Sequence, residues 1–416
     1  MTASASADLG ALRDVLKAAV APGSERDVER YDIDGATPGA AFEPGNREDL
    51  ATLVRLADEH GLAVVPQGAR TSLALGRPLA GYDLAVDLGG LRQTVEYVPD
   101  DLTVTVEAGR RLGALQAELR EHGQYLPIDV PPNDDVTIGG LLATARPGFW
   151  RGHLPAARDL ILGIEVCLPT GGTVRSGGRV VKNVTGYDLH RLHTGALGAF
   201  GVIVEATFKV APYPEASRTL VAKAPNLEAA TALALRTWDA SPVLRALTVL
   251  TSSAARLAGL EAAPQVLVEL AGAKRAIDRS ATDLASIAPF VDAPAGAWGA
   301  LRRAQGDSER TVVRAGVAPT ATRTLLERID QAGGTGWTNI APGAVVAILP
   351  EPTAEAIESL RSEAERLGGF LQVESAPAEL RRQVAPSPGD TVLVEALRDR
   401  FDAKRTINRG RWGAVL

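Results

Sequence analysis

A short polar loop, residues 66–72, constrains the fold more than any other stretch. It directly follows the apolar residues 62–65, which predict a strand, and an amphipathic helix predicted over residues 46–60 precedes that strand. No helix signal follows the loop. A Rossmann fingerprint needs the order strand, glycine-rich turn, helix, and a Walker loop ends in Gly-Lys-Ser/Thr. The order of elements therefore excludes the Rossmann fingerprint, and the absence of Gly-Lys-Ser/Thr excludes the Walker loop.

The loop nevertheless carries groups that suit a phosphate. Gly68 has no side chain, so backbone N–H groups can approach a bound anion. Arg70, Thr71 and Ser72 add a cation and two hydroxyl donors. A plain surface turn with one glycine explains the same residues. The loop therefore needs support from the rest of the chain.

A second candidate anion site follows the proline-stiffened residues 126–132. Thr137 suits the N-cap of a helix, and Gly139 and Gly140 then fall in the first turn. Free N–H groups and the helix dipole favour an anion at such a position. The alternative is that these small residues only allow close packing of the helix.

A third stretch, residues 177–201, is rich in glycine and polar groups. Gly195, Gly198 and Gly201 recur at three-residue spacing before the strand predicted over residues 202–210. Backbone with this pattern must pass close to a flat ligand or to itself. Asp188 is interpreted as a helix cap.

Composition limits the class of protein. A chain of 416 residues needs two or three lobes, and its net charge of -6 excludes the basic face of a nucleic-acid binder. Its sequence has no run of 18 apolar residues and no signal-peptide pattern, so we expect no transmembrane segment and a cytoplasmic protein. Cys167 is the only cysteine, which excludes internal disulfides; we interpret it as a core residue.

The second half predicts a separate α+β domain beyond a proline-rich boundary at residues 211–214. Strands are expected over residues 219–224, 244–251, 265–271, 310–317, 343–349 and 370–374. Helices are expected over residues 226–240, 273–288, 319–333 and 353–367.

Four segments, taken in order, resemble the FAD-binding oxidoreductases of the vanillyl-alcohol oxidase type, also called the PCMH fold. The segments are residues 64–72, residues 126–131 with 137–140, residues 182–201, and residues 401–410. Among them, the string Lys182-Asn-Val-Thr-Gly-Tyr-Asp188 is the most specific. It resembles the FAD-binding subunit of glycolate oxidase.

The resemblance implies an α+β, PCMH-type FAD-binding domain of two subdomains together with an α+β cap. The implied ranges are an N-terminal helix and lead-in over 1–37, the FAD domain over 38–214, the cap over 215–386, and a tail over 387–416 that returns to the FAD domain. It also implies non-covalent FAD. His153 is the one candidate near the right place for covalent attachment.

The implied FAD-binding residues lie in the first three segments. They are Pro66, Gly68, Ala69, Arg70, Thr71, Ser72, Pro131, Thr137, Gly139, Gly140, Gly198, Gly201, Val202 and Ile203. The chain departs from the family at Ala69 and Arg70, where further glycine is usual, and at Ala403 and Arg409, where prolines are usual. The backbone route of the first loop is therefore expected to differ.

Oxidation of a 2-hydroxy acid needs a cation for the carboxylate and a base for the hydroxyl proton. Related lactate dehydrogenases carry metal-binding histidines in the cap, but no histidine follows His193 here, so no metal is expected. Catalytic candidates are Lys182, Tyr187 and Arg409, with Arg411 also considered. Each has a structural alternative, such as a solvated lysine or a tyrosine at the core edge.

Three functions remain open at this point. The first is the FAD-binding subunit of a glycolate or D-lactate oxidase, with a catalytic flavoprotein subunit and an iron–sulfur subunit as partners. In that case the chain could attach peripherally to the inner membrane through a partner. The second is a free-standing flavoprotein dehydrogenase, and the third is a relative that has lost the flavin.

Overall fold

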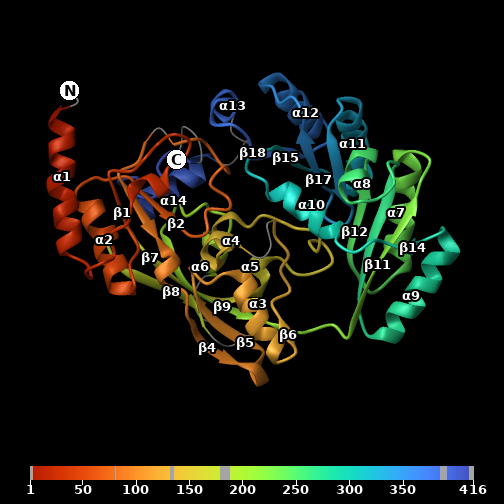
Figure 1. The fold of residues 1–416 in the computed structure, drawn as a ribbon, viewed down its shortest axis with the longest axis horizontal. Coiled ribbons are helices and arrows are strands. Elements are labelled where there is room, and N and C mark those ends of the chain that lie inside the picture. The colour runs from red at the N-terminus through yellow and green to blue at the C-terminus, as the bar shows by residue number, and fades with distance from the viewer. Residues whose placement is uncertain (1–2, 80, 132–134, 179–187, 385–390, 412–416) are drawn as a thin grey trace.

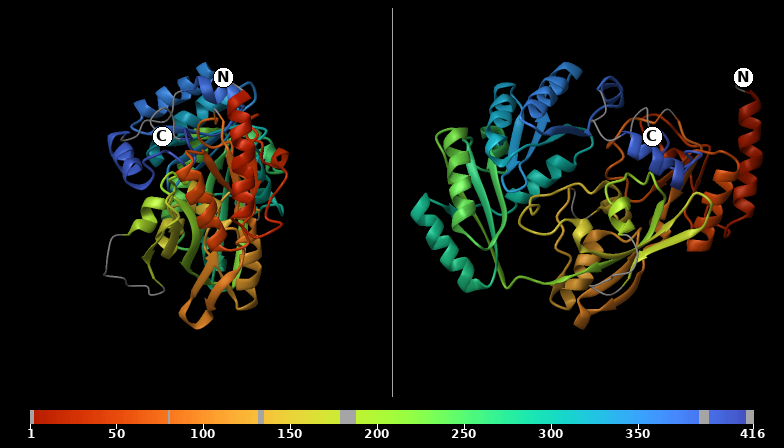
Figure 2. Two further views of the ribbon diagram at one scale, coloured as in Figure 1. Left: turned by 90° about the vertical axis from the view of Figure 1, so that its left-hand side faces the viewer. Right: turned by 180° about the vertical axis from the view of Figure 1, so that it is seen from behind.

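The computed structural model describes residues 3–79, 81–131, 135–178, 188–384 and 391–411. Two lobes lie side by side (Figure 1). The first lobe contains the N-terminal half and the C-terminal helix α14 (Thr391–Phe401), and the second lobe is the cap. The view from behind also places α14 against the first lobe (Figure 2).

The first lobe begins with a small parallel sheet in the order β1-β3-β2. Its elements are α1 (Ala3–Ala18), β1 (Ala40–Phe42), α2 (Arg47–Glu59), β2 (Val64–Gln67) and β3 (Leu84–Asp87). The Asn46 side chain accepts a hydrogen bond from the Asp49 N–H and so caps α2. The apolar stripe of α2, which includes Leu50 and Leu53, is fully buried against this sheet. The predicted helix and strand before the polar loop are therefore confirmed.

A second, antiparallel sheet of this lobe has the order β4-β5-β9-β7-β8. Its strands are β4 (Thr94–Val98), β5 (Thr103–Glu107), β7 (Ile161–Cys167), β8 (Thr173–Gly177) and β9 (Val202–Lys209). The helices of this part are α3 (Leu112–Glu121), α4 (Ile138–Thr144), α5 (Ala157–Leu160) and α6 (Leu189–His193). A short pair joins β6 (Gln124–Tyr125) to β10 (Ala211–Pro212). The two sheets share one hydrophobic core, which contains Cys167.

The cap is an eight-stranded antiparallel sheet in the order β14-β11-β13-β12-β16-β17-β15-β18. The strands are β11 (Ala216–Lys223), β12 (Leu244–Leu250), β13 (Gln265–Gly272), β14 (Val291–Asp292), β15 (Thr311–Gly316), β16 (Thr335–Asn339), β17 (Ala344–Leu349) and β18 (Phe370–Ser375). One face packs against α7 (Leu227–Ala240), α9 (Lys274–Ile287), α11 (Thr322–Gln331) and α12 (Ala354–Arg366). The other face packs against α8 (Ser252–Leu257) and α10 (Ala297–Gly306). In Figure 1, α10 lies between this sheet and the first lobe.

All strands and helices predicted for the second half are present, and the sequence missed β14, β16, α8, α10 and α13 (Ala378–Gln383). Strand β16 contains a single large apolar residue, Trp337, so it lacks the pattern of a buried strand. Its Gly336 lies against α11, where a Cβ would be 2.9 Å from a methyl group of Ile329. Contact with α11, rather than local propensity, therefore decides this strand.

Candidate functional site

The C-terminal tail lies beside the strand that leads into the polar loop. Val64 donates its N–H to the carbonyl of Thr406 at 2.7 Å, and the Asn408 N–H donates to the carbonyl of Val64 at 2.9 Å. The Asn408 side chain donates to the carbonyl of Leu197 at 2.7 Å. One residue of the tail thus connects β2 with the glycine-rich turn over residues 195–201.

The first and second candidate loops are in direct contact. A Cβ at Gly68 would lie 2.3 Å from the Thr137 hydroxyl oxygen. The same oxygen caps α4 by accepting the Gly140 N–H at 3.3 Å, which confirms the predicted N-cap. Glycine at position 68 is therefore required for the two loops to meet.

The N-terminal amides of α4 are not free for a ligand, so that expectation was wrong. Ile138 donates its N–H to Arg110 O at 2.9 Å, and Gly139 donates to Ala108 O at 2.7 Å. A Cβ at Gly139 would lie 3.0 Å from that of Ala108. Close packing, the alternative left open by the sequence, explains Gly139, because carbonyls of the turn after β5 occupy the donors that an anion would use.

Free donors are found instead in the polar loop itself. Within the described parts of the chain, the backbone N–H groups of residues 68–72 have no hydrogen-bond acceptor. Ala69, Thr71 and Ser72 are half-buried and Arg70 is exposed. Arg70 has φ 59°, so this residue itself adopts the left-handed backbone that glycine usually supplies. The loop thus presents a row of amides, two hydroxyls and a cation.

Two further features of this region suit a polar ligand. Gln67 is buried, and its side-chain amide donates to the Tyr82 hydroxyl at 3.0 Å, while its carbonyl oxygen has no partner in the described structure. An orphaned buried acceptor of this kind marks a position for an incoming donor. The Arg70 guanidinium lies 5.3 Å above the ring of Tyr31. Pro66 is half-buried in β2, next to this acceptor.

The chain's own packing requires glycine at positions 198 and 201. They have φ of 69° and 139°. A Cβ at Gly198 would lie 2.6 Å from the Asn408 amide nitrogen, and one at Gly201 would lie 2.5 Å from a Val166 methyl group. Here the backbone passes close to itself, one of the two readings of the sequence. Val202 and Ile203 are buried in the core of the lobe.

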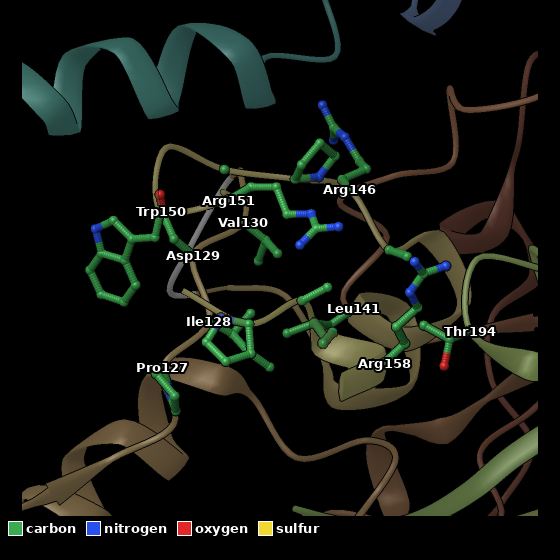
Figure 3. Close-up of a pocket in the computed structure, with 16 residues that line it drawn as sticks. Pro127, Ile128, Asp129, Val130, Leu141, Arg146, Trp150, Arg151, Arg158 and Thr194 are labelled. Atoms are coloured by element: carbon green, nitrogen blue, oxygen red, sulfur yellow. The ribbon is translucent and has the colours of Figure 1, made fainter. Parts of the chain in front are cut away.

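A pocket of about 230 Å³ lies at the C-terminal end of α4 (Figure 3). Leu141 of α4 contributes to its wall, and the loop after α4 contributes Arg146, Trp150 and Arg151. Further lining residues are Pro127, Ile128, Asp129, Val130, Ala145, Pro147, Gly148, Pro155, Ala156, Ala157, Arg158 and Thr194. Pro131, the last described residue before residues 132–134, is buried directly after this proline-rich segment. The pocket is thus mostly apolar with arginine at its wall.

A buried ionic cluster lies where the lobes meet, and no local sequence pattern predicts it. Glu374 of β18 is bound by Arg146 at 3.0 Å and by Arg314 at 2.8 Å, and the Gln305 side chain donates to it at 3.1 Å. Burial alone would raise the pKa of Glu374, but the two arginine charges and these hydrogen bonds outweigh it and lower the pKa to about 2. These residues come from separate segments, so only the fold brings them together.

Of the catalytic candidates, only Arg409 and Arg411 lie in the described part of the chain, and neither lines the pocket. Lys182 and Tyr187 lie outside the described residues. Arg409 is exposed and donates to Arg405 O at 2.8 Å and to Gly61 O at 3.3 Å, before the start of β2 and away from Gly68. Arg411 is buried, and its guanidinium donates to backbone carbonyls of residues 73, 75 and 77, so it holds the segment that follows the polar loop. Burial lowers the pKa of Arg411 to about 10.

The two remaining candidates, His153 and Asp188, both lie outside the pocket lining. His153 has a buried Nε2 without a partner in the described structure, and burial lowers its pKa. It does not line the pocket. Asp188 precedes α6, but its side chain makes no capping hydrogen bond and lies 3.6 Å from Arg191. In the described ranges, no three His, Cys, Asp or Glu side chains gather as metal ligands.

Comparison with known proteins connects this site to flavin binding. Residues 38–177 match the family model described as "FAD binding domain". Glycolate oxidase subunit GlcE of Escherichia coli (strain K12) is 36% identical over 181 residues, 43% of this chain and 51% of that protein. Glycolate oxidase subunit GlcD of Bacillus subtilis (strain 168) is 32% identical over 193 residues, 46% of this chain and 41% of that protein. The matched stretch thus spans about half or less of these relatives.

The fold comparison covers the whole chain. The crystal structure of p-cresol methylhydroxylase with substrate bound aligns with a TM-score of 0.75 and 14% identity, over 98% of this chain and 97% of that one. None of the described helices is long and apolar enough to cross a membrane. The chain therefore has the fold of p-cresol methylhydroxylase, and its residues 38–177 match an FAD-binding domain.

Proposed function

We propose that this chain is the FAD-binding subunit of an oxidoreductase that acts on small 2-hydroxy acids such as glycolate or D-lactate. The observation that carries the proposal is the row of amides over residues 68–72, which have no acceptor among the described residues and lie within the matched FAD-binding domain. Such donors suit the negative charge of a pyrophosphate. The contact between Gly68 and Thr137 sets the position of this row.

The cofactor would extend from this loop along α4. An α-helix rises 1.5 Å per residue, so the seven residues of α4 separate Thr137 from the pocket by roughly 10 Å. Loop residues 68–72 would hold the pyrophosphate, with the hydroxyls of Thr71 and Ser72 and the cation of Arg70 as further donors. Of the four glycines predicted to contact the cofactor, Gly140 remains a prediction, whereas contacts within the chain itself account for Gly139, Gly198 and Gly201. Bound flavin supplies the redox chemistry, and the chain supplies binding, orientation and exclusion of water.

The substrate class is supported by the relatives, which are named as glycolate oxidase subunits GlcD and GlcE. Those names also support assembly with other subunits, and we propose a catalytic flavoprotein and an iron–sulfur protein as partners. FAD is proposed to bind non-covalently, since the sequence offers only His153 for attachment and this residue lies outside the pocket lining. Lys182, Tyr187 and Arg409 remain predictions for catalysis.

A spectrum of the purified protein tests the proposal. We expect the absorption bands of oxidised flavin, released into the supernatant by acid precipitation. Persistent colour after addition of glycolate or D-lactate would support a subunit that needs its partner. Bleaching by either acid would show instead that the chain is a complete, free-standing dehydrogenase. A colourless protein that cannot be reloaded with FAD would overturn both and leave a flavin-free relative.

A further inference from the structure

Arginine side chains dominate the charge of the pocket at the end of α4. Of the pocket-lining residues, Arg146, Arg151 and Arg158 are cationic and Asp129 is the only acid. Figure 3 shows the Arg151 guanidinium directed into the middle of the pocket and that of Arg158 at its right-hand side. Arg146 points out of the pocket, toward the cap.

The charges of Asp129 and Arg146 are already compensated. Asp129 accepts from Arg302 and from the Phe149 N–H, both at 2.6 Å. Arg146 is bound to the buried Glu374 and to the carbonyl of Gln305, each at 3.0 Å. Neither group is therefore available to a ligand without loss of a buried ion pair.

Arg151 differs from its neighbours. It is half-buried, and in the described part of the chain its guanidinium has neither a hydrogen bond nor an ion pair. Arg158 is more exposed, and its nearest acid is Asp159 at 3.9 Å. The pocket therefore holds one inward-facing cation that has no counter-charge among the described residues, and a second, weakly paired cation at its side.

The backbone that carries Arg151 is fixed by the cap. The Phe149 ring lies 4.9 Å from that of Trp298 and is itself fully buried. The Trp150 indole N–H donates to Glu269 of β13 at 2.8 Å. Because these neighbours anchor the loop in the cap core, little backbone entropy would be lost when Arg151 binds a ligand.

We propose that Arg151 binds the carboxylate of the substrate, with Arg158 as a second, outer cation. A guanidinium presents two parallel N–H donors that match a carboxylate, and the apolar walls formed by Ile128, Val130 and Leu141 strengthen this pairing by excluding water. The identification of the anion as substrate rests on the proposed function. The proposal that an anion binds at Arg151 depends only on the residues of the pocket.

The test uses oxalate, an unreactive dicarboxylate, as the probe. Its dissociation constant is measured by isothermal titration calorimetry on the protein as purified and, for the FAD-loaded protein, by the change in flavin absorption. Variant R151M is expected to weaken oxalate binding roughly 10- to 100-fold. R158M is expected to have a smaller effect, and R151K to recover part of the lost affinity because it restores the charge. R175M is the matched control, since Arg175 is on β8 and its side chain is 72% exposed.

The outcomes separate this inference from the proposed function. An R151M protein that is folded by circular dichroism and binds oxalate like wild type would overturn the role of Arg151. FAD-loaded protein that shows no oxalate binding at all would do the same. If the protein cannot take up FAD but still binds oxalate through Arg151, the anion site is supported and the proposed function fails. Equal losses in R151M and R175M would point to non-specific electrostatics and would also overturn the inference.

Discussion

The α-carbon of Gly68 faces the Thr137 hydroxyl so closely that a methyl group at residue 68 would lie 2.3 Å from the oxygen. Gly68→Ala therefore forces Thr137 out of its capping position on α4. We expect a loss of about 1–3 kcal/mol in the free energy of unfolding and a weakening of FAD binding of roughly tenfold or more. Quenching of FAD fluorescence on binding and urea unfolding measure the two effects.

Gly45→Ala is the matched control for this variant. A Cβ at Gly45 would have nothing within 4 Å, and its backbone is not left-handed. It should bind FAD like wild type. If Gly68→Ala also binds FAD normally, the contact between the two loops has no role in holding the cofactor.

Asn408 is expected to contribute to stability in two separable ways. Its amide bonds Leu197, and its φ of 49° is left-handed. Asn408→Ala loses both contributions, about 2 kcal/mol in total, whereas Asn408→Gly keeps the backbone preference and should lose about half of that. Urea unfolding of the two variants separates the contribution of the side-chain hydrogen bond from that of the left-handed backbone. Equal losses would show that the left-handed backbone carries no cost here.

His193 should make the protein less stable in mild acid. Its ring lies 6.0 Å from that of Phe401, and burial lowers its pKa from 6.5 to about 4. The unfolded chain therefore takes up a proton first as pH falls, so stability is full above pH 6.5 and declines toward pH 4. Between pH 7.5 and 5.0 this residue should account for a loss of about 2 kcal/mol. His193→Leu should show a correspondingly smaller decline in urea unfolding, and an unchanged decline would contradict the assignment.

Removal of the Glu374 charge should destabilise the junction of the lobes. Glu374→Gln leaves Arg146 and Arg314 buried without their carboxylate, which we expect to cost about 3 kcal/mol. Urea unfolding and limited proteolysis of the cap measure the effect. Glu261→Gln breaks an exposed ion pair with Lys223 and should change stability by less than about 0.5 kcal/mol. Equal effects of the two changes would argue against a special role for the buried cluster.

Much of the candidate site could be predicted from local sequence. The polar loop after β2 and the Thr137 cap were found because strand ends, glycine and capping residues act over a few neighbouring residues. The order of the glycine-rich segments also predicted the FAD-binding fold that the comparisons show. The role of Gly139 was misjudged, because its N–H is taken by the carbonyl of Ala108, a residue distant in sequence.

The sequence by itself determined most of the elements, their order and the polar loop that suits a bound pyrophosphate, since these depend on short-range backbone and side-chain chemistry. The tertiary structure decided which of those donors stay free and which charges stay unpaired. Arg146 and Arg151 look alike in the sequence, yet the cap provides Glu374 for the first and no described counter-charge for the second. That difference arises from contacts between segments more than 200 residues apart, and no local pattern encodes them.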